Sequence, residues 1–104
     1  MATHEFESLA ESQPTQLAAW RVLEEGEEPI YHLIADGEKV GEADIHPAGD
    51  ICFIDWVGPR AELETRHLLD PFLIAIVASI RHDYPEVTDI EDYLGKHYRA
   101  GGLH

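Results

Sequence analysis

The chain has 104 residues and carries 21 Asp and Glu against 7 Lys and Arg, which gives a formal net charge of −14. This charge excludes a direct binder of nucleic-acid phosphates, because such proteins neutralise phosphates with clustered Lys and Arg. It also argues against docking on anionic membrane surfaces. A 44% apolar content is too high for an intrinsically disordered chain. We therefore expect one small folded domain with an acidic surface.

Targeting signals are not visible in the sequence. The first residues show neither the basic region nor the apolar stretch of a secretory signal. The longest apolar run, residues 72–78, is far shorter than the ~20 residues that a membrane span needs. Cys52 is the single cysteine, which excludes an intramolecular disulfide, and its apolar neighbours predict a buried thiol. These observations predict a cytoplasmic protein.

The N-terminal half alternates apolar segments with turn sequences. Residues 1–16 are polar, so we expect a flexible N-terminal arm before a single α+β domain at residues 17–104. Asp36-Gly37 is a strong hairpin signal, because a type I′ turn requires positive φ at both central residues. The spacing of the short apolar runs predicts a four-stranded antiparallel meander. Its strands are expected at residues 17–23, 30–35, 40–45 and 51–57.

The third and fourth of these strands have different faces. In the third, the alternation predicts an acidic outer face with Glu42 and Asp44, and an inner face with Ala43 and Ile45. The fourth is apolar on both faces, so we expect a central strand that is covered on both sides. Its faces are predicted to hold Ile51, Phe53 and Val57 on one side and Cys52, Ile54 and Trp56 on the other.

Apolar residues with helical spacing follow from Ala61 to Asp83. Pro71 leaves two arrangements open: Asp70 caps a new helix there, or one long helix kinks there. Residues 88–91 have the form of a capping box, which predicts a short helix at 89–98, with a strand at 86–90 as the alternative. The predicted fold class is therefore α+β: a four-stranded antiparallel meander packed against one long helix, with a short C-terminal helix or strand.

Motifs for catalysis or metal binding are scarce. The seven histidines form no H-x-x-x-H pair. Asp44 and His46 lie two residues apart with Asp50 across a turn, and two such ligands could bind a divalent ion, but nothing supplies a third ligand by spacing. There is no G-x-S-x-G elbow and no phosphate-binding glycine loop. We therefore predict no catalytic residues, no cofactor and no metal, and favour a non-enzymatic role.

Three segments carry a resemblance to a known family: residues 54–59, residues 68–73, and Tyr93-Leu94-Gly95 with residues 98–101. Over residues 30–101 the chain resembles the GNAT N-acyltransferases, in which the fourth strand of a meander runs into a pyrophosphate-binding turn and a long helix. The family's Arg/Gln-x-x-Gly-x-Gly/Ala loop is missing. Residues 60–66 contain no glycine, and Glu62 and Glu64 would repel a pyrophosphate. The resemblance implies a degenerate GNAT-like fold that lacks the acyl-CoA pyrophosphate loop.

The acidic charge is concentrated in the first sixty residues, which hold 13 acids and 3 bases, a net −10. Such a field attracts basic partners. We predict a small acidic binding or inhibitor protein, of the kind encoded by phages and mobile elements. It would engage a basic surface of a nucleic-acid-handling protein, as a mimic of nucleic acid. The predicted partner-binding residues are Glu24, Glu25, Glu27, Glu28, Asp36, Glu38, Glu42 and Asp44.

Three alternatives remain open at this stage. The acidity could serve solubility or adaptation to high salt. The protein could be a small GNAT-like acyltransferase that uses acetyl-CoA. It could also be a structural subunit of a homo-oligomer, such as a homodimer, with Trp20, Tyr31 or Trp56 at the interface.

Overall fold

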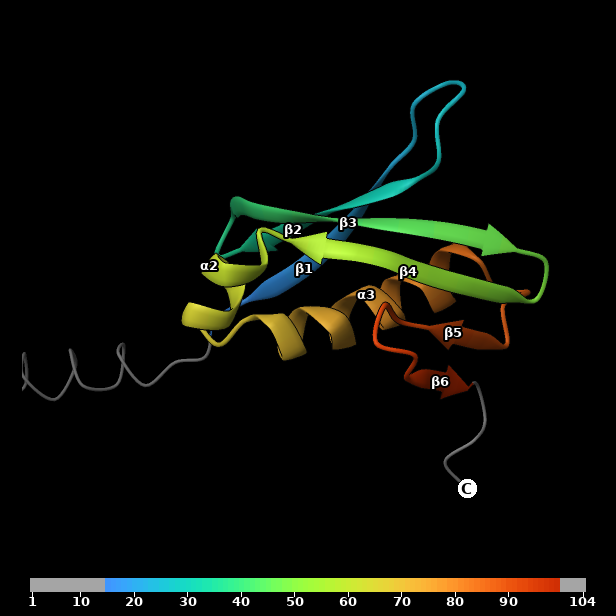
Figure 1. The fold of residues 1–104 in the computed structure, drawn as a ribbon. Coiled ribbons are helices and arrows are strands. Elements are labelled where there is room, and N and C mark those ends of the chain that lie inside the picture. The colour runs from blue at the N-terminus through green and yellow to red at the C-terminus, as the bar shows by residue number, and fades with distance from the viewer. Residues whose placement is uncertain (1–14, 100–104) are drawn as a thin grey trace, which may run out of the picture.

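The computed structural model describes residues 15–99, which form a six-stranded mixed sheet and two helices (Figure 1). The strands are β1 (Leu17–Val22), β2 (Ile30–Ala35), β3 (Glu38–Ala48), β4 (Ile51–Gly58), β5 (Asp89–Glu91) and β6 (His97–Arg99); the helices are α2 (Arg60–Thr65) and α3 (Leu69–Asp83). The strands lie in the sheet in their sequence order. β4 and β5 are parallel, and the other neighbours are antiparallel.

The predicted α+β class and the antiparallel meander of β1 to β4 are confirmed. The β2–β3 turn has φ values of 49° at Asp36 and 87° at Gly37. Both are positive, as a type I′ turn requires. The predicted arm at residues 1–16 lies outside the described residues, except for Thr15 and Gln16. Gln16 is tied to the β2–β3 turn, since its N–H donates to the Asp36 carboxylate at 2.9 Å.

The predicted helix of residues 61–83 is two helices. The chain leaves helical geometry at Arg66 and His67, and His67 takes a φ of 58°. The kinked single helix is therefore wrong. The new helix begins at Leu69, before Asp70, so Pro71 lies in its first turn, where a missing N–H breaks no helical hydrogen bond.

The C-terminal segment forms strands. The short helix expected at 89–98 is wrong, and the alternative strand appears as β5, shifted toward Glu91 and followed by β6. Thr88 does not cap a helix, because its hydroxyl donates to the Asp50 carbonyl oxygen at 3.3 Å. Asp92 is buried and holds the β5–β6 turn. Its carboxylate accepts hydrogen bonds from the backbone N–H groups of Leu94 and Lys96 and from the Tyr98 hydroxyl.

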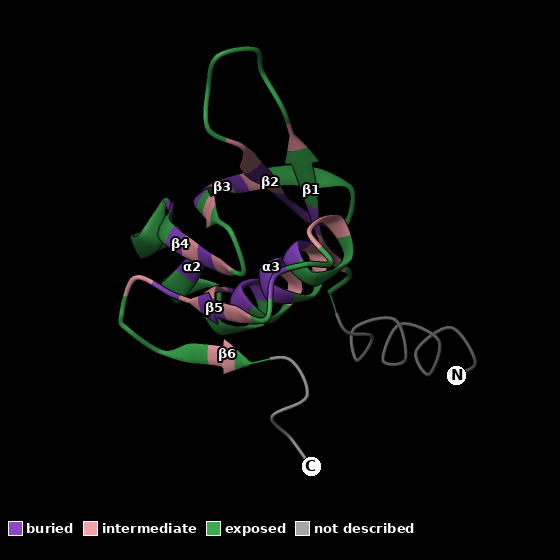
Figure 2. Cartoon of the chain, turned by 90° about the vertical axis from the view of Figure 1, so that its right-hand side faces the viewer, coloured by how far each residue is buried: buried purple, intermediate pink, exposed green. Residues whose placement is uncertain are grey.

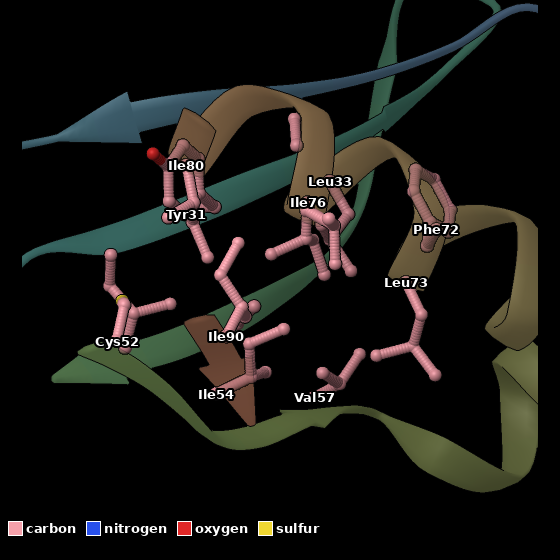
Figure 3. Packing of buried hydrophobic residues seen from close by; sticks show 14 of the residues in the cluster. Tyr31, Leu33, Cys52, Ile54, Val57, Phe72, Leu73, Ile76, Ile80 and Ile90 are labelled. Atoms are coloured by element: carbon pink, nitrogen blue, oxygen red, sulfur yellow. The ribbon is translucent and has the colours of Figure 1, made fainter. Parts of the chain in front are cut away.

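The sheet curves around α3, so that only its inner face is packed (Figure 2). α3 buries Phe72, Leu73, Ile76, Val77 and Ile80 against the inward side chains of the strands (Figure 3). In the part of the chain that the structure describes, neither helix is long and apolar enough to cross a membrane. The outer face of the sheet, opposite α3, carries exposed or partly exposed side chains that include Trp20, His32, Glu42 and Asp44.

Candidate functional site

The outer face is built by strand alternation. On β3 the structure confirms the predicted faces, since Ala43 and Ile45 are buried while Asp44 is exposed and Glu42 is partly exposed. On β2, Tyr31 and Leu33 point into the core, so His32 points outward between them. Trp20 lies on the outer face of β1 with 60% of its surface exposed. This face therefore combines an exposed aromatic ring with carboxylates.

A β-bulge in β4 changes the predicted faces of that strand. The register shifts so that Asp44 pairs with Trp56 but Ile45 pairs with Ile54, which leaves Asp55 as an extra residue. The extra residue reverses the alternation. Val57 joins Ile54 in the core, and Trp56 turns outward with 48% of its surface exposed. The predicted central position of β4 is right, but the predicted cover on both sides and the inward placement of Trp56 are wrong.

The strand register brings outward residues into rows. One row runs from Trp20 through His32 and Glu42 to Gly58, one residue from each of the first four strands. The next row runs through Val22, Ile30, Asp44 and Trp56. Directly paired side chains of neighbouring strands lie roughly 5 Å apart at Cβ. Glu42 and Asp44 are therefore placed between Trp20 at the β1 edge and Trp56 on β4.

Gly58 allows Trp56 to lie on the sheet surface. A Cβ atom added at Gly58 would lie 2.3 Å from an atom of the six-membered ring of Trp56, so the indole occupies the space above this glycine. Because Gly58 pairs with Glu42, the Trp56 ring lies beside Glu42 as well as beside Asp44. Glycine inside a strand often marks such a close approach. This role of Gly58 was not predicted from the sequence, although a Trp-Val-Gly sequence at a strand end offers that signal.

Glu42 is the most connected carboxylate on this face. Its Oε1 accepts a hydrogen bond from Lys39 Nζ at 2.6 Å, and His32 Nε2 lies 4.0 Å from the same oxygen. The hydrogen bond from Lys39 lowers the pKa of Glu42, with smaller contributions from the charges of Lys39 and His32. Lys39, Glu42 and Trp56 line a surface groove of about 260 Å³, together with Val40, Gly41, Gly58 and Pro59.

The eight predicted carboxylates do not form one patch. Glu24, Glu25, Glu27 and Glu28 lie in the exposed β1–β2 loop, which projects beyond the sheet (Figures 1 and 2). Asp36 and Glu38 lie at the β2–β3 turn, at the other end of β2, roughly 20 Å away for a strand of six residues. Glu42 and Asp44 lie between these ends. The structure therefore spreads the acidic residues along the whole first hairpin.

Some of this charge is compensated within the chain. Glu28 Oε1 lies 3.0 Å from His46 Nδ1, and Glu42 is paired with Lys39. His46 also stacks on Phe53, with ring centroids 6.4 Å apart. The two histidines on this face, His32 and His46, thus each contact a carboxylate, and His46 also contacts an aromatic ring. Among residues 15–99, no three His, Cys, Asp or Glu side chains converge as a metal site would require.

A second cluster of charged groups lies at the end of α3, away from the outer face. The hydroxyl of the fully buried Tyr31 donates to Asp83 Oδ2 at 2.8 Å, and Arg21 Nε lies 3.9 Å from the same oxygen. Burial and the bond to Asp83 raise the pKa of Tyr31. Burial raises the pKa of Asp83, but the hydrogen bonds from Tyr31 and His82 and the charge of Arg21 together lower it below its usual value. This arrangement ties the sheet to α3 and leaves no room for a ligand at Tyr31.

The segment that a GNAT acyltransferase would use for pyrophosphate is the short helix α2. Leu63 is buried in the core, and Arg60 Nε donates to Glu64 Oε1 at 2.8 Å. Glu62 lies in the first turn of α2. A carboxylate at this position disfavours a phosphate. The geometry of α2 therefore adds nothing in favour of acyl-CoA binding.

Comparisons with known proteins leave the chain without an assigned family. No protein-family model matches it, and neither a curated protein nor a solved structure is significantly similar to it. The GNAT resemblance thus rests on the sequence segments alone.

Proposed function

We propose that this chain is an acidic binding protein whose outer sheet face and β1–β2 loop engage a basic surface of a partner protein. The observation that carries the proposal is the placement of Glu42 and Asp44 between two exposed tryptophans on the face that α3 leaves open. A nucleic-acid-handling protein in the cytoplasm remains our preferred partner class, because its phosphate-binding surface is basic.

The chemistry of this face suits protein binding. Tryptophan is enriched among the residues that contribute most to binding energy, because it buries a large area with few rotatable bonds. Trp20 and Trp56 are both accessible, at 60% and 48% exposure. The surrounding carboxylates would accelerate encounter with a cationic partner and set the orientation of the complex. The loop carboxylates lie beyond the sheet and would extend this field toward the partner.

The alternatives receive less support. No observation favours an acetyl-CoA-dependent acyltransferase, because the segment that would bind pyrophosphate is the helix α2, which carries Glu62 and Glu64. Tyr31 is wrong as an interface residue of a homo-oligomer, since none of its surface is exposed. Trp20 and Trp56 remain available for self-association, and light scattering of the purified protein measures that outcome directly.

The test compares matched charge variants. Glu42→Gln with Asp44→Asn removes two charges from the outer face, while Glu62→Gln with Asp70→Asn removes two exposed charges from the helices. Affinity capture from the native host at two salt concentrations should recover the same basic protein with wild type and with the helix variant. The outer-face variant should recover it weakly.

Reversal of the four loop glutamates, Glu24, Glu25, Glu27 and Glu28, should also weaken binding and flatten its salt dependence. Equal loss in the outer-face and helix variants would show a non-specific charge effect. Unchanged binding at low salt after the loop reversal would refute the contribution of the loop. Either result would contradict the proposal.

A further inference from the structure

The groove at the ends of β3 and β4 combines three features: an aromatic wall, a carboxylate and a cation of the chain itself. Trp56 forms the wall, Glu42 supplies the carboxylate, and Lys39 supplies the cation. Lys39 is one of only two lysines in the sequence, the other being Lys96. A chain with almost no lysine therefore places one of its two lysines on the carboxylate of the groove that Trp56 lines.

Two glycines of the groove mark close approaches, one between the strands and one between β4 and Trp56. A Cβ atom at Gly41 would lie 2.5 Å from the Gly58 carbonyl oxygen, so β3 and β4 approach closely at this point. Gly58 also leaves space for the Trp56 ring, as described above. Any side chain at Gly58 would displace the indole from its position beside Glu42. Gly58 thus provides the space in which Trp56 lies next to a carboxylate.

This combination suits a cationic side chain. A cation over an indole face gains from the ring quadrupole, and an adjacent carboxylate adds a charge-assisted hydrogen bond. Arginine fits better than lysine, because its planar guanidinium can stack on an aromatic ring and pair with both oxygens of a carboxylate. Lys39 holds one oxygen of Glu42 in the free protein, through an exposed ion pair. Exposed pairs are weak enough for a competing cation to replace them.

We propose that this groove receives one arginine side chain of the basic partner, which displaces Lys39 from Glu42 and packs on Trp56. The inference rests on the proposed function and identifies the chemistry of the partner's contact residue. Lys39 acts as an internal competitor that lowers the affinity for arginine. Replacement of Lys39 therefore strengthens the binding of arginine, although Lys39 is itself a residue of the groove.

Tryptophan fluorescence offers a direct test with a capped tetra-arginine peptide as the probe. The Trp20→Phe variant leaves Trp56 as the single tryptophan, because the chain has two. Titration with the peptide should change the Trp56 emission and saturate. In this background, Lys39→Ala should tighten binding about two- to fivefold relative to Lys96→Ala, which removes the same charge from the β5–β6 turn. Glu42→Gln should weaken binding by a similar factor relative to Glu86→Gln, an exposed carboxylate that follows α3.

The outcomes separate this inference from the proposed function. Equal affinities of the Lys39 and Lys96 variants, or a Trp56 emission that the peptide leaves unchanged at millimolar concentration, would overturn the groove as an arginine site. If the outer-face variant still loses the partner in the capture experiment, the proposed function stands without it. If the peptide saturates Trp56 but wild type captures no basic protein, the groove stands and the proposed function fails.

Discussion

Replacing Tyr31 by Phe removes one hydroxyl from the core and tests how the sheet is held to α3. The lost hydrogen bond is 2.8 Å long and its acceptor is the Asp83 carboxylate. Hydrogen bonds to charged groups contribute about 1.5–3 kcal/mol. Asp83 keeps 20% of its side-chain surface exposed and retains contacts with Arg21 and His82, so water and these groups offset part of the loss. We expect Tyr31→Phe to lower the free energy of unfolding by about 1–2 kcal/mol at pH 7, measured by urea denaturation.

The pH dependence of this loss gives the sharper measurement. The pKa of Asp83 is lowered in the folded protein, so its stabilising contribution is present above the unfolded pKa of ~3.9 and is lost as pH falls through the folded value. The difference in the free energy of unfolding between Tyr31→Phe and wild type should therefore shrink as the pH falls through the folded pKa of Asp83. At the alkaline end the pKa of Tyr31 is raised, mainly by burial, so wild type loses stability as pH rises above ~10, at up to ~1.4 kcal/mol per pH unit. The variant should lack the part of this slope that Tyr31 contributes, while the parts from Cys52, Tyr93 and Tyr98 remain.

Tyr93→Phe is the matched control, because the Tyr93 hydroxyl is buried and has no hydrogen-bond partner among residues 15–99. Loss of an unpartnered buried hydroxyl should be neutral or slightly stabilising. Equal destabilisation by the two substitutions would refute the reasoning, since it would mean that the bond to Asp83 contributes nothing of its own. If the loss of stability in Tyr31→Phe persists unchanged at acid pH, the role of the ionised Asp83 carboxylate is refuted.

Two further predictions concern the close contacts of β4. Gly41→Ala should destabilise the fold by about 3 kcal/mol, because the new Cβ meets the backbone carbonyl of Gly58 at 2.5 Å and the paired strands cannot separate. For Gly58→Ala the nearest atoms to the new Cβ belong to the Trp56 ring, which is half-exposed and can turn toward solvent. This substitution should therefore cost less than about 1 kcal/mol but shift the tryptophan emission; the reverse order in thermal unfolding would contradict both. Cys52 is fully buried, and burial together with the charge of Asp55 raises its pKa to about 11. Thiol reagents at pH 8 should therefore modify Cys52 only as the protein unfolds, and its contribution to stability should decline as pH rises from ~9 through about 11; rapid labelling of the native protein would contradict this.

Local sequence patterns were sufficient for the first hairpins. β1 and β2 match their predicted segments within one residue, because alternation and turn chemistry act between near neighbours. Asp36-Gly37 predicted its turn for the same reason, since both residues accept positive φ. The acidic outer face of β3 also followed from alternation alone, and Glu42 and Asp44 lie where it placed them.

Elements that depend on distant partners were predicted poorly. β5 has three residues and is a strand because it pairs with β4, which precedes α3 in the chain, so the sequence offered it only as the alternative to a helix. The helical signal at 61–83 left one kinked helix and two helices as alternatives, because the break at His67 lies in backbone geometry that apolar spacing does not record. No sequence pattern predicted β6, whose register depends on the turn held by Asp92.

The candidate site shows the same division. The net charge of −14 and its concentration in the first sixty residues are properties of the sequence, and they alone argued for a basic partner. The carboxylates that were expected to act together lie at both ends of β2 and on the face between them, an arrangement that depends on strand register. The bulge at Asp55 turned Trp56 from the core to the surface, and only the pairing of β4 with β3 determines that reversal. Composition therefore determined the sign of the charge. The tertiary structure decided which aromatic rings and carboxylates share one surface, because cross-strand neighbours are distant in the chain.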